Sequence, residues 1–206
     1  MTWRVRRSFA RCAAKDNELP KLGTFFAVVG PSGAGKDTLI DAAEKSLGED
    51  KRFVFARRYI TRPEDSGGEA HRAISREAFE RKAKGGEFAL SWSAHGLYYG
   101  VPVAVVEATS SGSNVVCNLS RSVVQEASRM FSNLAVLHIT APPEVLAQRL
   151  AERNREAAHD IDQRLNRCVP QFGAPNRVVE FENVGPVEET ANQFIRTLLK
   201  ISTQHA

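Results

Sequence analysis

The stretch "VVGPSGAGKDTLI" (residues 28–40) decides the fold of this chain. A short apolar run leads into glycines, then into a lysine and a helix-like segment. Gly30, Gly35 and Lys36 match the phosphate-binding loop pattern G-x-x-x-x-G-K-S/T. Glycines in such a loop let successive backbone N–H groups turn towards an anion, and the lysine reaches the terminal phosphates of a nucleotide. The stretch therefore predicts a nucleoside triphosphate site between a strand and a helix.

The position after the lysine departs from this pattern. It holds Asp37 where the pattern asks for Ser or Thr, and Thr38 comes one residue late. A carboxylate is a hard oxygen donor that Mg²⁺ accepts, and a decayed loop would be expected to have lost Lys36 or its glycines as well. We therefore predict a working ATP site with Mg²⁺ held by Asp37 and Thr38. The predicted ATP-binding residues are Gly30, Pro31, Ser32, Gly33, Ala34, Gly35, Lys36, Asp37 and Thr38.

Outside this loop, strand-like and helical patterns alternate along the chain. We expect strands at 24–29, 53–55, 88–92, 115–119, 134–140 and 177–181. We expect helices at 35–47, 75–84 with Ser75 as its N-cap, 121–131, from Pro143 to about 153, from 161, and from about 187. This alternation predicts an α/β fold with a parallel sheet flanked by helices. Ligands of such folds bind at the carboxyl ends of the strands, where the loop is expected to lie.

Composition limits the class of protein further. The chain has 206 residues, 42% of them hydrophobic, which suits one globular domain. No apolar run reaches the roughly 18 residues of a membrane helix, and the three scattered cysteines favour a reducing cytoplasm. Residues 1–22 hold six basic and two acidic residues, which accounts for the whole formal net charge of +4. We expect this segment to be a disordered extension, with a nucleic-acid or membrane-contacting arm or a targeting segment as alternatives.

The order of several motifs resembles the guanylate kinase family. These motifs are "GPSGAGK", "RRYITRP", "AHRAIS", "GGEFALSW", "GLYYG" and "RLAERNREAAHDIDQRL". The resemblance implies a P-loop kinase domain over residues 23–206, with an acceptor-binding insert at about 58–102 and an arginine-bearing lid at about 149–167. It also implies that Lys36, Arg149, Arg153 and Arg164 are the catalytic cations.

Several departures from the family pattern fall on the residues that would read guanine. Ser91 stands where a glutamate is expected before the insert tryptophan, and the run "CNLS" (residues 117–120) replaces an "LDID"-like run. His71 stands in place of a phosphate-binding tyrosine, and an arginine expected shortly after the run Thr61-Arg62-Pro63 is missing. A site that lacks the hydrogen-bonding partners of a base discriminates strongly against it. GMP is therefore not the expected acceptor.

What remains looks like one branch of the family, the ribose 1,5-bisphosphate phosphokinases of phosphonate breakdown. That likeness implies transfer of a phosphoryl group from ATP to ribose 1,5-bisphosphate, giving 5-phosphoribosyl 1-diphosphate. The implied substrate-binding residues are Arg58, Arg62, His71, Ser91, Tyr99, Ser120 and Arg121. Trp92 is interpreted as packing, and Asn183 as either an adenine contact or an ordinary turn residue.

Two other functions stay open at this point. One is a guanylate kinase or another nucleoside monophosphate kinase, which intact acidic base-readers would favour. The other is an inactive guanylate kinase-like interaction module, which an eroded phosphate loop would favour. We expect a small-molecule substrate and neither a nucleic acid nor a membrane as partner. The sequence leaves monomer and homodimer open.

Overall fold

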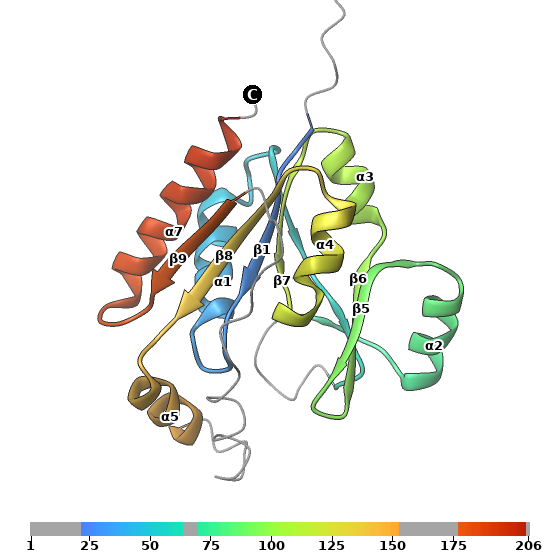
Figure 1. Ribbon diagram of the computed structural model, residues 1–206, viewed down its shortest axis with the longest axis horizontal. Coiled ribbons are helices and arrows are strands. Elements are labelled where there is room, and N and C mark those ends of the chain that lie inside the picture. The colour runs from blue at the N-terminus through green and yellow to red at the C-terminus, as the bar shows by residue number, and fades with distance from the viewer. Residues whose placement is uncertain (1–21, 64–69, 153–176, 205–206) are drawn as a thin grey trace, which may run out of the picture.

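The main sheet of the protein is parallel, and the phosphate loop lies at the carboxyl ends of its strands (Figure 1). The structure is a computed structural model that describes residues 22–63, 70–152 and 177–204. Five strands lie in the order β2-β7-β1-β8-β9. Their bounds are β1 Phe25–Val29, β2 Phe53–Ala56, β7 Asn114–Asn118, β8 Leu134–Thr140 and β9 Arg177–Glu182. All four strand pairings are parallel, as the alternation of strands and helices predicts.

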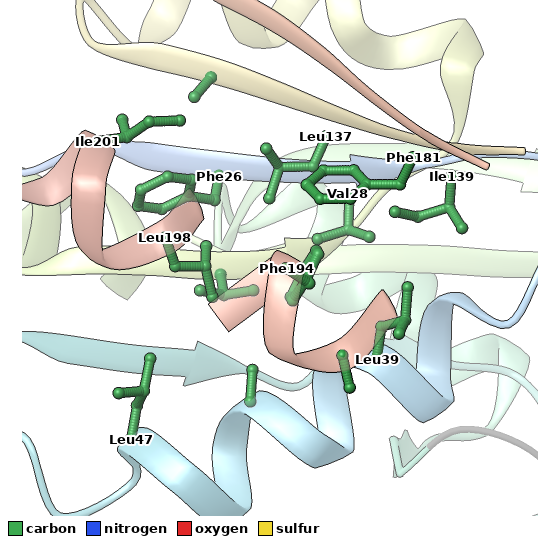
Figure 2. Close-up of a cluster of buried hydrophobic side chains, with 14 of the residues drawn as sticks. Phe26, Val28, Leu39, Leu47, Leu137, Ile139, Phe181, Phe194, Leu198 and Ile201 are labelled. Atoms are coloured by element: carbon green, nitrogen blue, oxygen red, sulfur yellow. The ribbon is translucent and has the colours of Figure 1, made fainter. Parts of the chain in front are cut away.

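Strand β1 is buried along its whole length because helices cover both faces of the sheet. Phe26 and Val28 pack towards α1 (Lys36–Leu47) and α7 (Val187–Ser202) in the cluster that Figure 2 shows. The alternate residues of the strand pack towards α3 (Ala104–Ser110) and α4 (Val124–Met130) on the other face. A parallel strand covered on both sides reads as a continuous apolar run, which explains the sequence that precedes the loop.

A second sheet of four strands lies beside the first, in the order β4-β3-β6-β5 (Figure 1). It comprises β3 Tyr59–Ile60, β4 Arg72–Ala73, β5 Phe88–Ala94 and β6 Leu97–Pro102. Helix α2 (Arg76–Lys84) packs on one face through Phe79, whose ring centroid lies 4.8 Å from that of Phe88. The Ser75 side chain accepts a hydrogen bond from the backbone N–H of Ala78, so the predicted N-cap is confirmed.

The expected strands and helices of the described ranges are all present, and the structure adds four elements. Strands β3, β4 and β6 and helix α3 were not expected. Two of these strands have only two residues each, too few to show a periodic pattern. The helix expected at 121–131 begins as a 3₁₀ turn, η2 (Arg121–Val123), before α4. The helix expected from 161 lies outside the described residues.

The last crossover places α5 (Pro143–Glu152) below the carboxyl end of β8, on the loop side of the sheet (Figure 1). Within the described ranges, no helix has the length and apolar character needed to cross a membrane.

Candidate active site

The phosphate loop leaves β1 and turns sharply into α1. Gly30 has φ 151°, and a Cβ atom at this position would collide with the carbonyl oxygen of Ile139 in the adjacent strand. Gly35, with φ 89°, is the N-cap of α1, and no side chain caps the helix. The first N–H groups of α1 therefore face the loop with the positive end of the helix dipole, which is a suitable environment for phosphate.

The Lys36 side chain folds back over this loop. Its ammonium group donates to the carbonyl oxygens of Gly30 at 3.0 Å and of Pro31 at 2.8 Å. These bonds hold a positive charge at the mouth of the loop. Ala34 is fully buried in the core, whereas Ser32 and Thr38 are exposed. The structure thus brings together the residues that the sequence predicted for ATP binding.

Asn183, which follows β9, supports the phosphate loop by a hydrogen bond to its backbone. This residue is only 2% exposed and donates from Nδ2 to the carbonyl oxygen of Ala34 at 2.8 Å. Its own backbone N–H donates to Thr140 at 2.7 Å. Arg149 of α5 donates to the carbonyl oxygens of Asn183 at 3.1 Å and of Gly33 at 3.5 Å. Asn183 is therefore more than a turn residue, and Arg149 lies against the loop itself.

Asp37 is held by a residue from another strand. The Nδ2 group of Asn118, the last residue of β7, donates to Asp37 Oδ1 at 2.7 Å. Both line a small pocket with Arg58 between α1 and the end of β2. Within the part of the chain that the structure describes, no cluster of three or more His, Cys, Asp or Glu side chains could hold a metal ion. One carboxylate beside a phosphate loop nevertheless fits Mg²⁺, which usually takes one or two protein carboxylates plus phosphate oxygens and waters.

Arg58 lies on an aromatic pair contributed by the second sheet. The rings of Trp92 and Tyr99 stack with centroids 5.3 Å apart and planes 3° from parallel. The Arg58 guanidinium lies 5.4 Å from the Trp92 centroid and 5.3 Å from the Tyr99 centroid. Arg58 is only 8% exposed. A guanidinium held against two aromatic rings has a defined position from which to contact an anion.

His71 is the partner of Arg62. Its Nε2 lies 3.0 Å from the Arg62 carbonyl oxygen, and its Nδ1 lies 3.4 Å from the Arg62 guanidinium. An arginine can only donate, so the two contacts are satisfied together when Nδ1 accepts and the proton is on Nε2. His71 is 7% exposed. The structure therefore places His71 behind Arg62, where it orients this predicted substrate-binding cation.

The remaining predicted residues are more scattered. Ser91 lines a pocket of about 390 Å³ with Phe79 and Glu80 of α2. Neighbouring strand residues point to opposite faces, so Ser91 lies on the other face of β5 from Trp92. Ser120 is the N-cap of η2 and accepts from the Ser122 N–H at 3.3 Å, and Arg121 begins that turn. Arg153 and Arg164, and most of the predicted lid, lie outside the described residues.

Two ion pairs involve charged side chains of α2. Lys82 bonds Glu87 at 2.5 Å, and this hydrogen bond raises the pKa of the Lys82 ammonium. Arg76 bonds Glu80 one turn later at 3.1 Å, which raises the pKa of the Arg76 guanidinium. Both pairs lie on or next to α2, and neither involves the aromatic pair that carries Arg58.

Three residues of the site were outside the predicted set. Asn118 ends the buried strand β7, and Asn183, considered from the sequence only as an adenine contact or a turn residue, follows β9; a polar residue at the carboxyl end of a parallel strand is the signal that marks both. Trp92, interpreted as packing, does pack against the core, and it also forms half of the surface on which Arg58 lies. Its pairing opposite Tyr99 depends on the β5–β6 register, which the sequence alone does not display.

Comparisons with known proteins agree with this geometry. The sequence model of the guanylate kinase family matches residues 23–198. A curated ribose 1,5-bisphosphate phosphokinase PhnN of Brucella melitensis is 43% identical over 91% of this chain and 97% of its own length. A bifunctional ribose 1,5-bisphosphokinase-thymidine phosphorylase of Azorhizobium caulinodans is 44% identical over 86% of this chain. The chain spans only about a quarter (26%) of that bifunctional relative.

A solved structure shows the same fold. The crystal structure of guanylate kinase from Anaplasma phagocytophilum superposes with a TM-score of 0.63 at 20% identity, covering 89% of this chain and 88% of that one. The predicted P-loop kinase fold is thereby confirmed. The chain belongs to the guanylate kinase family and, within it, to the ribose 1,5-bisphosphate phosphokinases.

Proposed function

We propose that this protein transfers the γ-phosphoryl group of ATP to the 1-phosphate of ribose 1,5-bisphosphate. The products are ADP and 5-phosphoribosyl 1-diphosphate, in the breakdown of phosphonates. Relatives that the chain matches over nearly their whole length carry this activity in their names. The single observation in the structure that supports it most is Arg58, a fixed cation on the Trp92–Tyr99 pair.

The donor side would hold ATP through backbone N–H groups of residues 30–38 and the Lys36 ammonium. Lys36 would exchange the carbonyl oxygens of Gly30 and Pro31 for phosphate oxygens. Asp37 would hold Mg²⁺ with the help of the Thr38 hydroxyl, and the ion would supply charge neutralisation on the triphosphate. Arg149 already lies against Gly33, so its charge is close to the same phosphates.

The acceptor side is suited to an anion rather than a base. Arg58 is buried and is oriented by the aromatic pair. Arg62 is half-buried and is oriented by His71. Tyr99 would place its ring under Arg58 and its hydroxyl towards the acceptor. We include Ser120 and Arg121 as further acceptor contacts, with Arg121 the strongest because it carries charge, and leave out Ser91 because it lies on the α2 face of β5. Arg153 and Arg164, in the predicted lid at about 149–167, would add further positive charge next to the phosphates.

The chemistry requires little beyond positioning. A 1-phosphate oxygen of the acceptor attacks the γ-phosphorus, and the bond from that phosphorus to the bridging oxygen of ADP breaks. The attacking oxygen is already ionised at neutral pH, so no side chain has to remove a proton. Two polyanions must approach each other, and fixed cations offset their repulsion while stabilising charge in the transition state. This requirement matches a site with several arginines and one lysine.

We also propose that the second sheet, within residues 58–102, is the acceptor-binding insert of a kinase domain that starts near residue 23. Its β3 strand begins directly after Arg58, and its β6 strand presents Tyr99. Both residues therefore belong to this part of the chain. Residues 1–22 would play no part in the reaction.

The test is to incubate the purified chain with Mg²⁺-ATP and ribose 1,5-bisphosphate and to identify the product by ³¹P NMR. We expect a new diphosphate resonance and one ADP for each acceptor consumed. ADP release with GMP in place of the sugar would favour a nucleoside monophosphate kinase. Binding of ATP without turnover of either acceptor would favour an interaction module.

A further inference from the structure

The contact between Asp37 and Asn118 joins two distant parts of the chain. Asp37 is the second residue of α1, and Asn118 ends β7, 81 residues later. Asn118 is 9% exposed and is paired in register with Val28 of β1. The next residue, Leu119, donates its N–H to Val28 at 2.9 Å. Asn118 is therefore fixed by the central strand of the sheet, and the amide it directs at Asp37 has a defined position.

An amide is the appropriate partner for an ionised carboxylate at this place. Its N–H donates to Oδ1 at 2.7 Å and adds no charge. A carboxylate has two oxygens and about four acceptor positions, so one such bond leaves Oδ2 and part of Oδ1 for another ligand. A second carboxylate at position 118 would meet Asp37 directly, and one of the two groups would tend to hold a proton. The asparagine thus orients Asp37 while leaving it able to bind a cation.

We propose that Asn118 is a positioning residue for metal binding: it holds the Asp37 carboxylate in the orientation in which Asp37 ligates Mg²⁺. This inference rests on the proposed Mg²⁺-ATP site but not on the identity of the acceptor. Asp37 replaces a hydroxyl residue of the usual loop pattern, and a longer, charged side chain has more ways to turn away from the metal. The bond from Asn118 removes this freedom. Partners that orient metal ligands contribute roughly 10- to 100-fold in metal affinity.

A purely structural role is the competing explanation. In that case the hydrogen bond would only link α1 to β7, and Asp37 would only favour the start of its helix. The chain offers a matched control in Asn114, at the other end of the same strand. Asn114 is also buried, at 6% exposure, and its Oδ1 accepts from the Thr24 N–H at 3.1 Å. Loss of this hydrogen bond should lower the stability of the fold without changing the phosphate loop.

The experiment measures ATP affinity by titration calorimetry across a series of Mg²⁺ concentrations and in EDTA, with no acceptor present. Mn²⁺ binding to the ATP complex is followed separately by electron paramagnetic resonance. The variants are Asn118→Ala, Asp37→Asn, the double variant and Asn114→Ala. We expect Asn118→Ala to weaken the metal-dependent part of ATP binding roughly tenfold and to leave affinity in EDTA unchanged. Asp37→Asn should weaken it more.

The double variant decides whether Asn118 acts through Asp37. We expect it to match Asp37→Asn alone, because an amide with no carboxylate to orient has nothing further to lose. Additive losses, or an Asn118→Ala protein that is less stable but as metal-dependent as Asn114→Ala, would overturn the inference. If Asp37→Asn also leaves metal dependence unchanged, the proposed role of Asp37 fails with it. Turnover of the sugar bisphosphate by the unaltered protein is measured separately, so failure of this inference and failure of the proposed function are distinguishable.

Discussion

The parallel sheet and the smaller mixed sheet present positive charge to phosphates in different ways. At the end of the parallel sheet, the loop uses backbone N–H groups, a helix end and one lysine. On the mixed sheet, the charge comes from side chains, with Arg58 on an aromatic pair and Arg62 against His71. A backbone site needs a fixed sequence pattern, so its function survives in a recognisable motif. A side-chain site can exchange its residues on the same fold, and there the specificity of a family can change.

The largest expected effect comes from the backbone site. Lys36→Ala removes the positively charged side chain of loop residues 30–38 and should lower kcat by at least about a hundredfold, as loss of a transition-state donor does. The fold should persist, because the Lys36 ammonium lies at the loop, bonded to the carbonyl oxygens of Gly30 and Pro31, and not in the apolar core. Steady-state kinetics and circular dichroism check this. Lys45→Ala, at the exposed far end of α1, is the matched control and should keep its activity.

The second prediction addresses the side-chain site. Arg58→Ala removes a charge-assisted contact worth about 1.5–3 kcal/mol, so kcat/KM for the sugar bisphosphate should fall roughly 10- to 100-fold with ATP affinity unchanged. Arg58→Lys should recover only part of this loss, because an ammonium does not stack on Trp92 and Tyr99 as a guanidinium does. An equal loss of ATP affinity in the alanine variant would contradict the separation of the two sites.

A third prediction concerns the support of the loop. Asn183→Ala leaves the buried Ala34 carbonyl without its donor, which should cost about 1–3 kcal/mol of unfolding free energy and raise KM for ATP. Asn183→Asp should cost more, because it buries a charge against that carbonyl oxygen. Urea denaturation of the two variants beside the wild type measures the order. An aspartate variant as stable as the wild type would mean that Asn183 does not support the loop.

The smallest effect is expected at the helix of the insert. Ser75→Ala removes the N-cap of α2 and should lower stability by about 1 kcal/mol. Activity at room temperature should stay within twofold, since α2 covers the face of the insert that is opposite to Arg58. Denaturation curves and a kinetic assay on one preparation are sufficient. A loss of activity of more than twofold at a temperature where the variant is still folded would place α2 closer to the acceptor than this account does.

The two sites also differ in how far the sequence predicted them. The loop followed from residues 28–40 because every part of its geometry depends on local sequence, including the glycine conformations and the start of α1. Neither Asn183 nor Asn118 could be connected to it, because those contacts span 149 and 81 residues and depend on which strands are neighbours. The expectation that ligands bind at the carboxyl ends of parallel strands indicated the correct edge of the sheet, but not which residues meet there.

The insert was predicted less completely for a physical reason. Its strands are short, and its key arrangement is a cross-strand pair, Trp92 opposite Tyr99, whose register is set by β5 and β6 together. Ser91 was selected because it replaces a base-reading residue, and the fold places it on the α2 face instead. A substitution in a family pattern thus shows which interaction is absent at a position, whereas the structure shows where the new side chain lies and what it contacts.

The most direct test of the central claim is the specificity ratio between two acceptors. We would measure kcat/KM for ribose 1,5-bisphosphate and for GMP on the same preparation with saturating Mg²⁺-ATP. An acceptor site built from cations, without base-reading carboxylates, predicts a ratio above about 1,000 in favour of the sugar bisphosphate. A ratio below one would contradict the account, because it would mean that the mixed sheet still reads guanine.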